Sequence, residues 1–278
     1  MPDNISGDER NSHSTLGHNA NILTAILASK AIEVASRKLS TPVSVLKNAP
    51  AFSRKCLSMK QSLLNSETGI ISEFKRKSPS LGWIHEEADV VQVAAGYSSA
   101  GASGISILTD FEYFGGTTID LMAARPFITC PLLRKDFVID EYQLYEAKAM
   151  GADVVLLIAA ALTVVQSLEL ASKAHELGME VLLEIHNAEE IAHANDFVDM
   201  LGVNNRNLKT FEQSIQTSFD LAALIPEKYV KVSESGISRT ETVKELRKVG
   251  YKGFLMGENF MKEENPAEAI ARFIEALR

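Results

Sequence analysis

Eight short apolar runs recur at regular intervals from residue 69 to the end of the chain, and they constrain the fold more than any other feature. Successive runs start 20 to 35 residues apart, which is the spacing of repeated βα units. Most are continuously hydrophobic, as in the segment 154–158, and this is typical of parallel strands buried on both faces. The runs begin near Ile70, Ile105, Leu132, Val154, Val181, Leu201, Val230 and Phe254.

Amphipathic segments with helical periodicity lie between the runs. Three of them, at 141–150, 164–177 and 241–249, are each followed by a glycine that can end a helix (Gly151, Gly178 and Gly250). Eight βα units predict an α/β fold of the (β/α)8, or TIM-barrel, class. A doubly wound open sheet is the alternative, but the even spacing and the lack of a Gly-x-Gly-x-x-Gly motif after the first run favour the barrel.

The N-terminal part of the chain lies outside this repeat. Residues 1–20 are polar and aperiodic, and we interpret them as a flexible tail. From residue 21 an apolar stripe that includes Leu23, Ile26 and Val34 predicts a helix to about Leu39, and a second short helical stretch is expected around 50–65. Residues 21–278 are therefore predicted to form a single barrel domain that includes these N-terminal helices.

Charge and composition narrow the classes of partner. The 36 acidic and 28 basic residues give a net charge of −8, which argues against nucleic acid but leaves room for a local basic pocket. The longest apolar run, 154–165, is well short of the about 20 residues that a membrane span needs. Two cysteines at no metal-like spacing, and a start without signal-peptide features, indicate a reduced, cytoplasmic chain with no metal site. We favour a monomer.

Polar residues gather where the predicted strands end. In a TIM barrel the carboxyl ends of the strands carry the chemistry, and an apolar barrel does not bury charge there without a reason. A single charge of this kind is more often a surface residue, but five strands share the pattern. We place His186 on the opposite face from Glu184, packed against a helix and outside the site. The candidate residues are Glu73, Lys75, Lys135, Glu184, Asn204, Arg206, Glu234 and Ser235.

Two glycine-bearing segments follow the last two predicted strands. Gly236 lies in the first, at 235–238, and Gly257 lies in the second, at 256–259. Glycine lets backbone amides approach an anion closely, and the loops after strands 7 and 8 are the usual phosphate site of such barrels. The two segments together therefore predict a phosphorylated small-molecule ligand.

Several motifs resemble those of the indole-3-glycerol phosphate synthase family. The resemblance covers the chain from the N-terminal helix to the end, and EFKRKSPS and LLRKDF are its most specific parts. The matching segments are EFKRKSPS (73–80), LTD (108–110), FGG (114–116), LLRKDF (132–137), LE (183–184), NNR (204–206) and SESGI (233–237).

The resemblance implies a carboxy-lyase of tryptophan biosynthesis that needs no cofactor. Its substrate is 1-(2-carboxyphenylamino)-1-deoxyribulose 5-phosphate, which is cyclised with loss of CO2 and water by acid and base steps. Carried over, Lys135 is the general acid, Glu184 its partner and base, and Lys75, tuned by Glu73, holds the substrate carboxylate and assists dehydration. The remaining roles are orientation by Asn204 and Ser235, supporting contacts by Glu234 and Arg206, and phosphate binding near Ser78, Gly236 and Gly257.

The chain departs from the family pattern at two positions. Asn207 stands where the family commonly has Asp, and Glu258 stands where it often has Ser. Because a carboxylate repels phosphate, we expect the backbone at Glu258, rather than its side chain, to bind. We also expect a monofunctional chain without the second barrel that some relatives carry. The alternatives are another phosphosugar-binding barrel isomerase or lyase, and a non-catalytic barrel that acts as a binding module.

Overall fold

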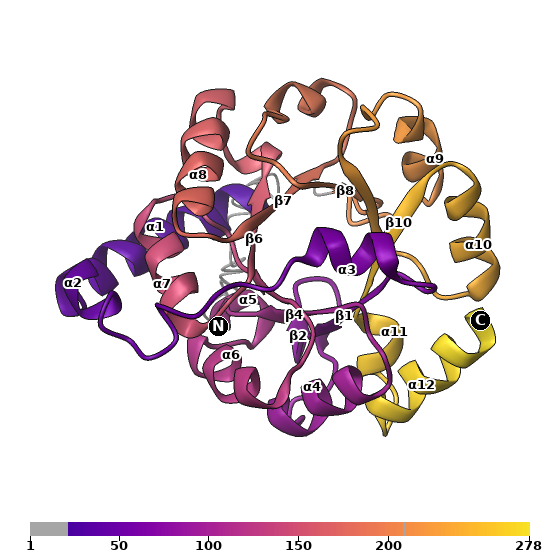
Figure 1. Cartoon of the computed structure of the whole chain (residues 1–278), viewed down its shortest axis with the longest axis horizontal. Helices are drawn as coiled ribbons and strands as arrows, with labels where there is room; N and C mark the ends of the chain where they lie inside the picture. Colours follow the sequence, from indigo (N-terminus) through magenta and orange to yellow (C-terminus); the bar gives the residue numbers. More distant parts are fainter. Residues whose placement is uncertain (1–21, 208–209) are drawn as a thin grey trace, which may run out of the picture.

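The computed structural model describes residues 22–207 and 210–278, and its centre is a closed barrel of eight parallel strands (Figure 1). Around the barrel the strands follow the order β1-β10-β9-β8-β7-β6-β5-β4. Every predicted apolar run coincides with one of them, so the predicted TIM barrel is confirmed. The strands are β1 (Ile70–Phe74), β4 (Gly104–Leu108), β5 (Leu132–Lys135), β6 (Val154–Ile158), β7 (Glu180–Ile185), β8 (Met200–Asn204), β9 (Val230–Glu234) and β10 (Tyr251–Met256).

Helices surround the barrel and connect successive strands. The three helices predicted between the strands are α7 (Tyr142–Met150), α8 (Val164–Glu176) and α10 (Thr240–Lys248), and the glycine after each has a positive φ. The connection from β7 to β8 carries only the short 3-10 helix η3 (Glu189–His193). The other helices are α4 (Val90–Ser99), α5 (Phe111–Phe114), α6 (Thr118–Ala124), η1 (Arg125–Phe127), η2 (Ala159–Ala161), α9 (Gln216–Ala222), α11 (Glu258–Met261) and α12 (Pro266–Leu277).

From residue 22 onward, three helices precede the barrel. The predicted first helix is α1 (Ile22–Ser40), whereas the predicted stretch 50–65 is helical only in α3 (Met59–Asn65), where Ser58 caps the first turn. A short helix that the sequence did not predict, α2 (Val43–Leu46), follows Pro42. A hairpin of β2 (Lys77–Ser78) and β3 (Gly82–Trp83) follows β1. The predicted tail, residues 1–20, lies outside the described residues.

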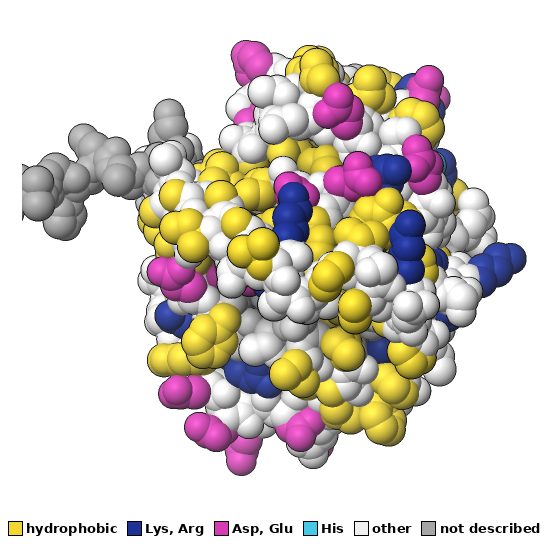
Figure 2. Space-filling model, turned by 90° about the vertical axis from the view of Figure 1, so that its left-hand side faces the viewer, with side chains coloured by type: hydrophobic (Ala, Val, Ile, Leu, Met, Phe, Trp, Pro, Cys, Tyr) yellow, Lys and Arg dark blue, Asp and Glu magenta, His cyan; other side chains and the backbone are white. Residues whose placement is uncertain are grey.

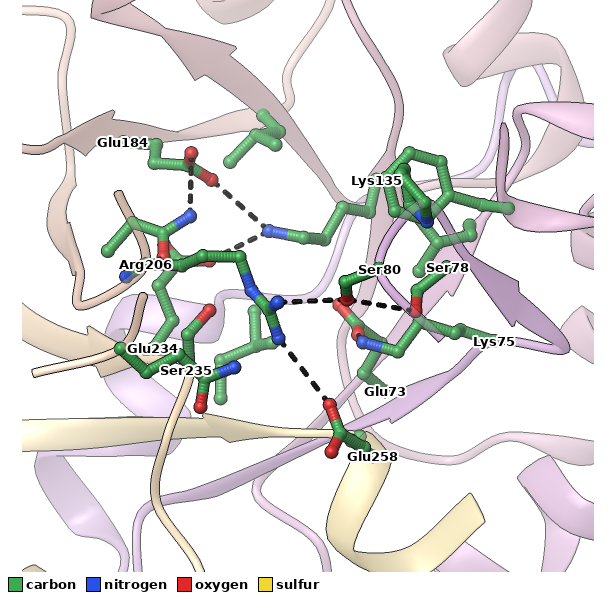
Figure 3. Close-up of a pocket in the computed structure, with 18 of the residues that line it drawn as sticks. Glu73, Lys75, Ser78, Ser80, Lys135, Glu184, Arg206, Glu234, Ser235 and Glu258 are labelled. Atoms are coloured by element: carbon green, nitrogen blue, oxygen red, sulfur yellow. Dashed lines mark hydrogen bonds and ion pairs between the residues drawn. The ribbon is translucent and has the colours of Figure 1, made fainter. Parts of the chain in front are cut away.

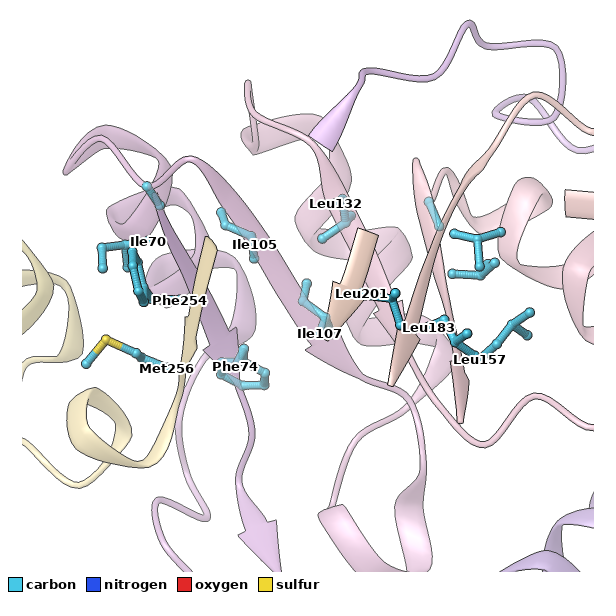
Figure 4. Close-up of a cluster of buried hydrophobic side chains, with 14 of the residues drawn as sticks. Ile70, Phe74, Ile105, Ile107, Leu132, Leu157, Leu183, Leu201, Phe254 and Met256 are labelled. Carbon is cyan, nitrogen blue, oxygen red and sulfur yellow. The ribbon is translucent and has the colours of Figure 1, made fainter. Parts of the chain in front are cut away.

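Alternate residues of each strand face two different cores. Figure 4 shows the outer core, between strands and helices, to which β1 contributes Ile70 and Phe74. Ile71 faces the inner core, which α3 closes with Met59 and Leu63 at the amino ends of the strands. Because side chains alternate with a period of two, Glu73 follows Ile71 on the inner side and lies at the opposite end of the barrel.

The surface carries a mixture of acidic and basic side chains, as the composition predicts. On the face that Figure 2 displays, acidic and basic side chains are interspersed, with no broad region of one sign. Within residues 22–207 and 210–278, none of the helices has the length and apolar character that crossing a membrane requires.

Candidate active site

A pocket opens at the carboxyl ends of the barrel strands, and all twelve residues that the sequence singled out line it (Figure 3). They come from six of the eight strands or the loops that follow them. The fold therefore brings together residues that are up to 185 positions apart. The twelve are Glu73, Lys75, Ser78, Lys135, Glu184, Asn204, Arg206, Glu234, Ser235, Gly236, Gly257 and Glu258.

Lys135 lies between two buried carboxylates at the centre of the pocket. Its Nζ is 2.7 Å from Oε2 of Glu234 and 3.3 Å from Oε2 of Glu184. Burial alone would lower the pKa of Lys135, but these two carboxylates outweigh it and raise that pKa above its usual value. Lys135 is therefore an ammonium group that can donate a hydrogen bond or a proton.

The two carboxylates that share Lys135 differ in protonation. Burial raises the pKa of both, but Glu184 also accepts a hydrogen bond from Nδ2 of Asn204 at 3.0 Å and lies 3.2 Å from Nε2 of His186. These contacts and Lys135 hold the pKa of Glu184 below its usual range. For Glu234, burial is the larger effect and raises the pKa to about 7. Of the pair, Glu184 is therefore the ionised member near neutral pH.

Glu234 can occupy its position because residue 202 on the neighbouring strand is a glycine. A Cβ at Gly202, on the neighbouring strand β8, would lie 2.5 Å from Oε1 of Glu234, so only glycine leaves room for this carboxylate. The same Oε1 atom is buried and finds no hydrogen-bond partner among the described residues. A carboxyl group without such a partner is costly to ionise, in keeping with its raised pKa.

A second pair, Lys75 and Glu73, lies on the opposite wall of the pocket. Nζ of Lys75 is 2.7 Å from Oε1 of Glu73, whose side chain is buried. A Cβ at Gly257 would lie 2.7 Å from the same carboxylate oxygen. Gly257 therefore allows Glu73 its position, a role that the prediction of a phosphate-binding glycine did not include.

The mouth of the pocket is crossed by Arg206. Its guanidinium donates to Oγ of Ser80 at 3.0 Å and lies 3.4 Å from Oε2 of Glu258. The side chain of Glu258 is 41% exposed, so it turns only partly to solvent. Ser78 lies nearby, where its hydroxyl accepts from the backbone N–H of Leu81. The Glu258 carboxylate thus occupies an anion position beside Arg206.

Two successive left-handed residues shape the loop after β9. Ser235 has φ 69° and Gly236 has φ 73°, and the carbonyl of Ser235 accepts a hydrogen bond from Nδ2 of Asn205 at 3.0 Å. A positive φ is uncommon for serine, and such backbone strain is concentrated at functional sites.

His186 is not where the sequence analysis placed it. Residues 184 and 186 are two apart and so share a face, and the imidazole lies between the Glu184 carboxylate and Glu190 of η3. Side chains two residues apart on a strand point to the same face, and this rule would have placed His186 beside Glu184. Also missed were the pocket-lining residues Ser80, Phe114, Phe137 and, from α1, Ile22, Leu23 and Ile26, of which the last two belonged to the predicted apolar stripe.

Helix α1 is fixed beside the pocket by a buried lysine. Nζ of Lys30, which is 1% exposed, lies 2.9 Å from Asp110 and 3.0 Å from Asp136. Burial opposes the charge on Lys30, but both carboxylates raise its pKa. Asp136 also receives a hydrogen bond from Arg134. Because Asp136 directly follows Lys135, the covering helix is anchored next to the central lysine.

Fold and site together have the form of a TIM-barrel enzyme, with paired lysines and carboxylates in a pocket at the carboxyl ends of the strands. Comparison with known proteins specifies the family: the family model of indole-3-glycerol phosphate synthase matches residues 23–273. The chain is 51% identical to the indole-3-glycerol phosphate synthase of Bacteroides thetaiotaomicron, over 92% of this chain and 99% of the relative. It is 41% identical to that of Bordetella pertussis, over 91% and 98%. The chain belongs to the indole-3-glycerol phosphate synthase family, the carboxy-lyases of tryptophan biosynthesis.

Solved structures support the fold. A tryptophan synthase α-subunit from Pyrococcus furiosus aligns with a TM-score of 0.56 at 17% identity and covers 76% of this chain and 97% of its own. KGPDC from Streptococcus mutans aligns with a TM-score of 0.57 at 12% identity, over 75% and 96%.

Proposed function

We propose that Lys135 is the general acid and Glu184 the base with which this enzyme cyclises 1-(2-carboxyphenylamino)-1-deoxyribulose 5-phosphate to indole-3-glycerol phosphate, releasing CO2 and water. The observation that carries the assignment is the position of Lys135 between the buried carboxylates of Glu184 and Glu234. Ring closure requires a proton donor at the ketone oxygen while the aryl ring attacks the carbonyl carbon. The charged Lys135 can supply that proton at the centre of the pocket.

Glu184 is suited to the role of base because it is ionised before substrate binds and is in contact with Lys135. Loss of CO2 restores the aryl ring, and Glu184 then accepts the proton that leaves the new five-membered ring as its hydroxyl is lost as water. Glu234, with a pKa of about 7, is the second candidate, since a base with a pKa near the working pH is effective. The pH–rate profiles of Glu184→Gln and Glu234→Gln distinguish the two candidates. Only the variant that lacks the true base loses the limb that titration of this base produces.

Lys75 holds the substrate carboxylate and assists the later loss of water, with Glu73 as its partner. Its 2.7 Å pairing with Glu73 keeps the ammonium aimed into the pocket. Asn204, which already donates to Glu184, and Ser235 orient the reacting groups. The geometry supports these roles because all four residues line the pocket around Lys135.

The phosphate binds at the mouth of the pocket, near Ser78, Arg206 and the backbone of Gly236. The left-handed backbone at Gly236 and its lack of a side chain suit a close approach of the anion. Arg206 supplies the positive charge, and phosphate replaces Glu258 as its partner. Gly257 is the second glycine of the proposed phosphate site, and it also leaves the room that Glu73 occupies.

A cytoplasmic location and a monomeric state belong to the same proposal. The thiols of Cys56 and Cys130 are unpaired, which suits a reducing compartment.

The decisive experiment mixes the purified chain with the carboxyphenylamino substrate and follows indole fluorescence. We expect product with the wild-type chain and a loss of turnover in Lys135→Met, with both proteins folded by circular dichroism. Turnover of Lys135→Met above about a tenth of the wild-type rate contradicts the role of Lys135, since a general acid contributes about 10²–10⁴-fold.

A further inference from the structure

The imidazole of His186 bridges two carboxylates behind the central site. Nε2 lies 3.2 Å from Oε1 of Glu184, and Nδ1 lies 3.2 Å from Oε2 of Glu190. The side chains of His186 and Glu190 are 12% and 16% exposed. The bridge therefore runs from the pocket to η3 in a largely desolvated environment.

Glu190 is held in place by its own loop. Its Oε2 accepts the backbone N–H of His186 at 2.7 Å, and its Oε1 accepts from Nδ2 of Asn187 at 3.1 Å. The backbone N–H of Glu190 in turn donates to Oδ1 of Asn187 at 3.0 Å. These local contacts make Glu190 a fixed anion against which the imidazole is set.

An imidazole placed between two carboxylates is stable in its charged form, in which both ring nitrogens carry a proton. Burial alone would lower the pKa of His186, but Glu184 and Glu190 outweigh it and raise that pKa to about 10. His193 lies in η3, the 3-10 helix that contains Glu190, and it behaves differently from His186. Its Nδ1 contacts the hydroxyl of Ser167, and burial lowers its pKa.

We propose that His186 is a positioning residue whose imidazolium, fixed by Glu190, orients the Glu184 carboxylate and keeps it ionised. The groups that face Glu184 are Lys135 from β5, Asn204 from β8 and His186 at the end of β7, with Glu234 on the far side of Lys135. Nε2 has no aligned hydrogen-bond partner among the described residues, and it lies at an ion-pair distance of 3.2 Å from the Glu184 carboxylate.

The inference rests on the proposed roles of Lys135 and Glu184. When Lys135 gives its proton to the ketone oxygen, the positive charge beside Glu184 is lost from that side. The imidazolium of His186 remains, so the buried carboxylate is not left without a cation and stays ready to accept the ring proton.

The first test observes the imidazole itself in the full chain. The ring nitrogens of histidine are followed by nuclear magnetic resonance during a pH titration, with the signal of His186 assigned from His186→Gln. We expect His186 to be charged at pH 8, and Glu190→Gln to lower its titration midpoint by about one pH unit or more. A midpoint at or below the ordinary histidine value of about 6.5 overturns the proposal.

The second test measures kcat, KM and their pH dependence for His186→Gln, Glu190→Gln and the matched control His193→Gln. We expect kcat to fall about tenfold to a hundredfold in His186→Gln with little change in KM, as for a misplaced catalytic group. The acidic limb of kcat/KM moves to higher pH, because Glu184 loses a neighbouring cation. His193→Gln should match the wild type.

A fall in kcat without movement of the acidic limb identifies a purely structural role and overturns the proposal, as does an unchanged kcat. If His186→Gln does not fold, Glu190→Gln is judged by the same criteria. Glu184→Gln is measured alongside. If it retains the wild-type profile, the assignment of Glu184 as base has failed; if it loses the limb while the His186 variant does not shift it, only the inference about His186 has failed.

Discussion

Replacing Lys135 by Met should make the stability of the protein depend on pH in a new range. The substitution removes the cation 2.7 Å from Glu234 and keeps much of the side chain's volume. Glu184 retains its contacts with His186 and Asn204, so Glu234 is the carboxylate that changes most.

The magnitude follows from proton binding. In the wild type the pKa of Glu234 is raised from 4.5 to about 7, so the folded state binds more protons than the unfolded state between these values. Its contribution to stability therefore falls as pH rises from 4.5 and levels off near pH 7. Without Lys135 the pKa of Glu234 rises further. The free energy of unfolding therefore keeps falling above pH 7, at about 1.4 kcal/mol per pH unit. Between about pH 7 and pH 9 the variant should lose about 3 kcal/mol relative to the wild type.

Urea unfolding followed by circular dichroism at pH 6, 7, 8 and 9 measures this difference. We expect the two proteins to differ little in their pH trend below pH 7 and to diverge above it. The double variant Lys135→Met/Glu234→Gln is the control, since it lacks the titrating group and should not diverge. Parallel stability curves from pH 6 to pH 9 for wild type and Lys135→Met would refute the reasoning.

Three further changes test other parts of the site. Glu184→Gln should lower kcat about 10²–10⁴-fold and remove a limb of the pH–rate profile, and a normal profile at a near-normal rate would make the residue structural. Lys30→Met should cost about 3 kcal/mol in urea unfolding, because Asp110 loses its buried partner, and should raise KM by loosening α1; unchanged stability and KM would contradict the anchor. Glu258→Ser should bind inorganic phosphate equally or more tightly in competition with substrate, since a carboxylate 3.4 Å from Arg206 is removed, and weaker inhibition would show that the side chain binds phosphate.

The barrel was predictable because parallel strands buried on both faces leave continuous apolar runs in the sequence. The inward direction of Glu73 followed from the period of two, counted from Ile71. The same period, misapplied at one position, hid His186. The stretch 50–65 was predicted as too long a helix, because helix is confined to the residues after the cap at Ser58.

Other features had no local signal in the sequence. The different protonation of Glu184 and Glu234 depends on His186 at one carboxylate and on the space left by Gly202 at the other. His186 is local to Glu184, but Gly202 and Glu234 belong to different strands, and a one-dimensional pattern does not report which strands are neighbours. The pairing of Lys30 with Asp110 likewise joins residues 80 positions apart.

The attachment of α1 through Lys30 to Asp136 also makes substrate binding and helix docking thermodynamically linked. Ile22 and Ile26 of this helix form part of the pocket wall, and the residue that Lys30 contacts is the backbone neighbour of Lys135. If docking of α1 makes the free energy of substrate binding more favourable, then bound substrate stabilises the docked helix by the same free energy, because coupling between two equilibria is reciprocal. Hydrogen exchange of the α1 amides, slowed by substrate, would therefore report the same coupling free energy as the change in substrate affinity on loosening the helix.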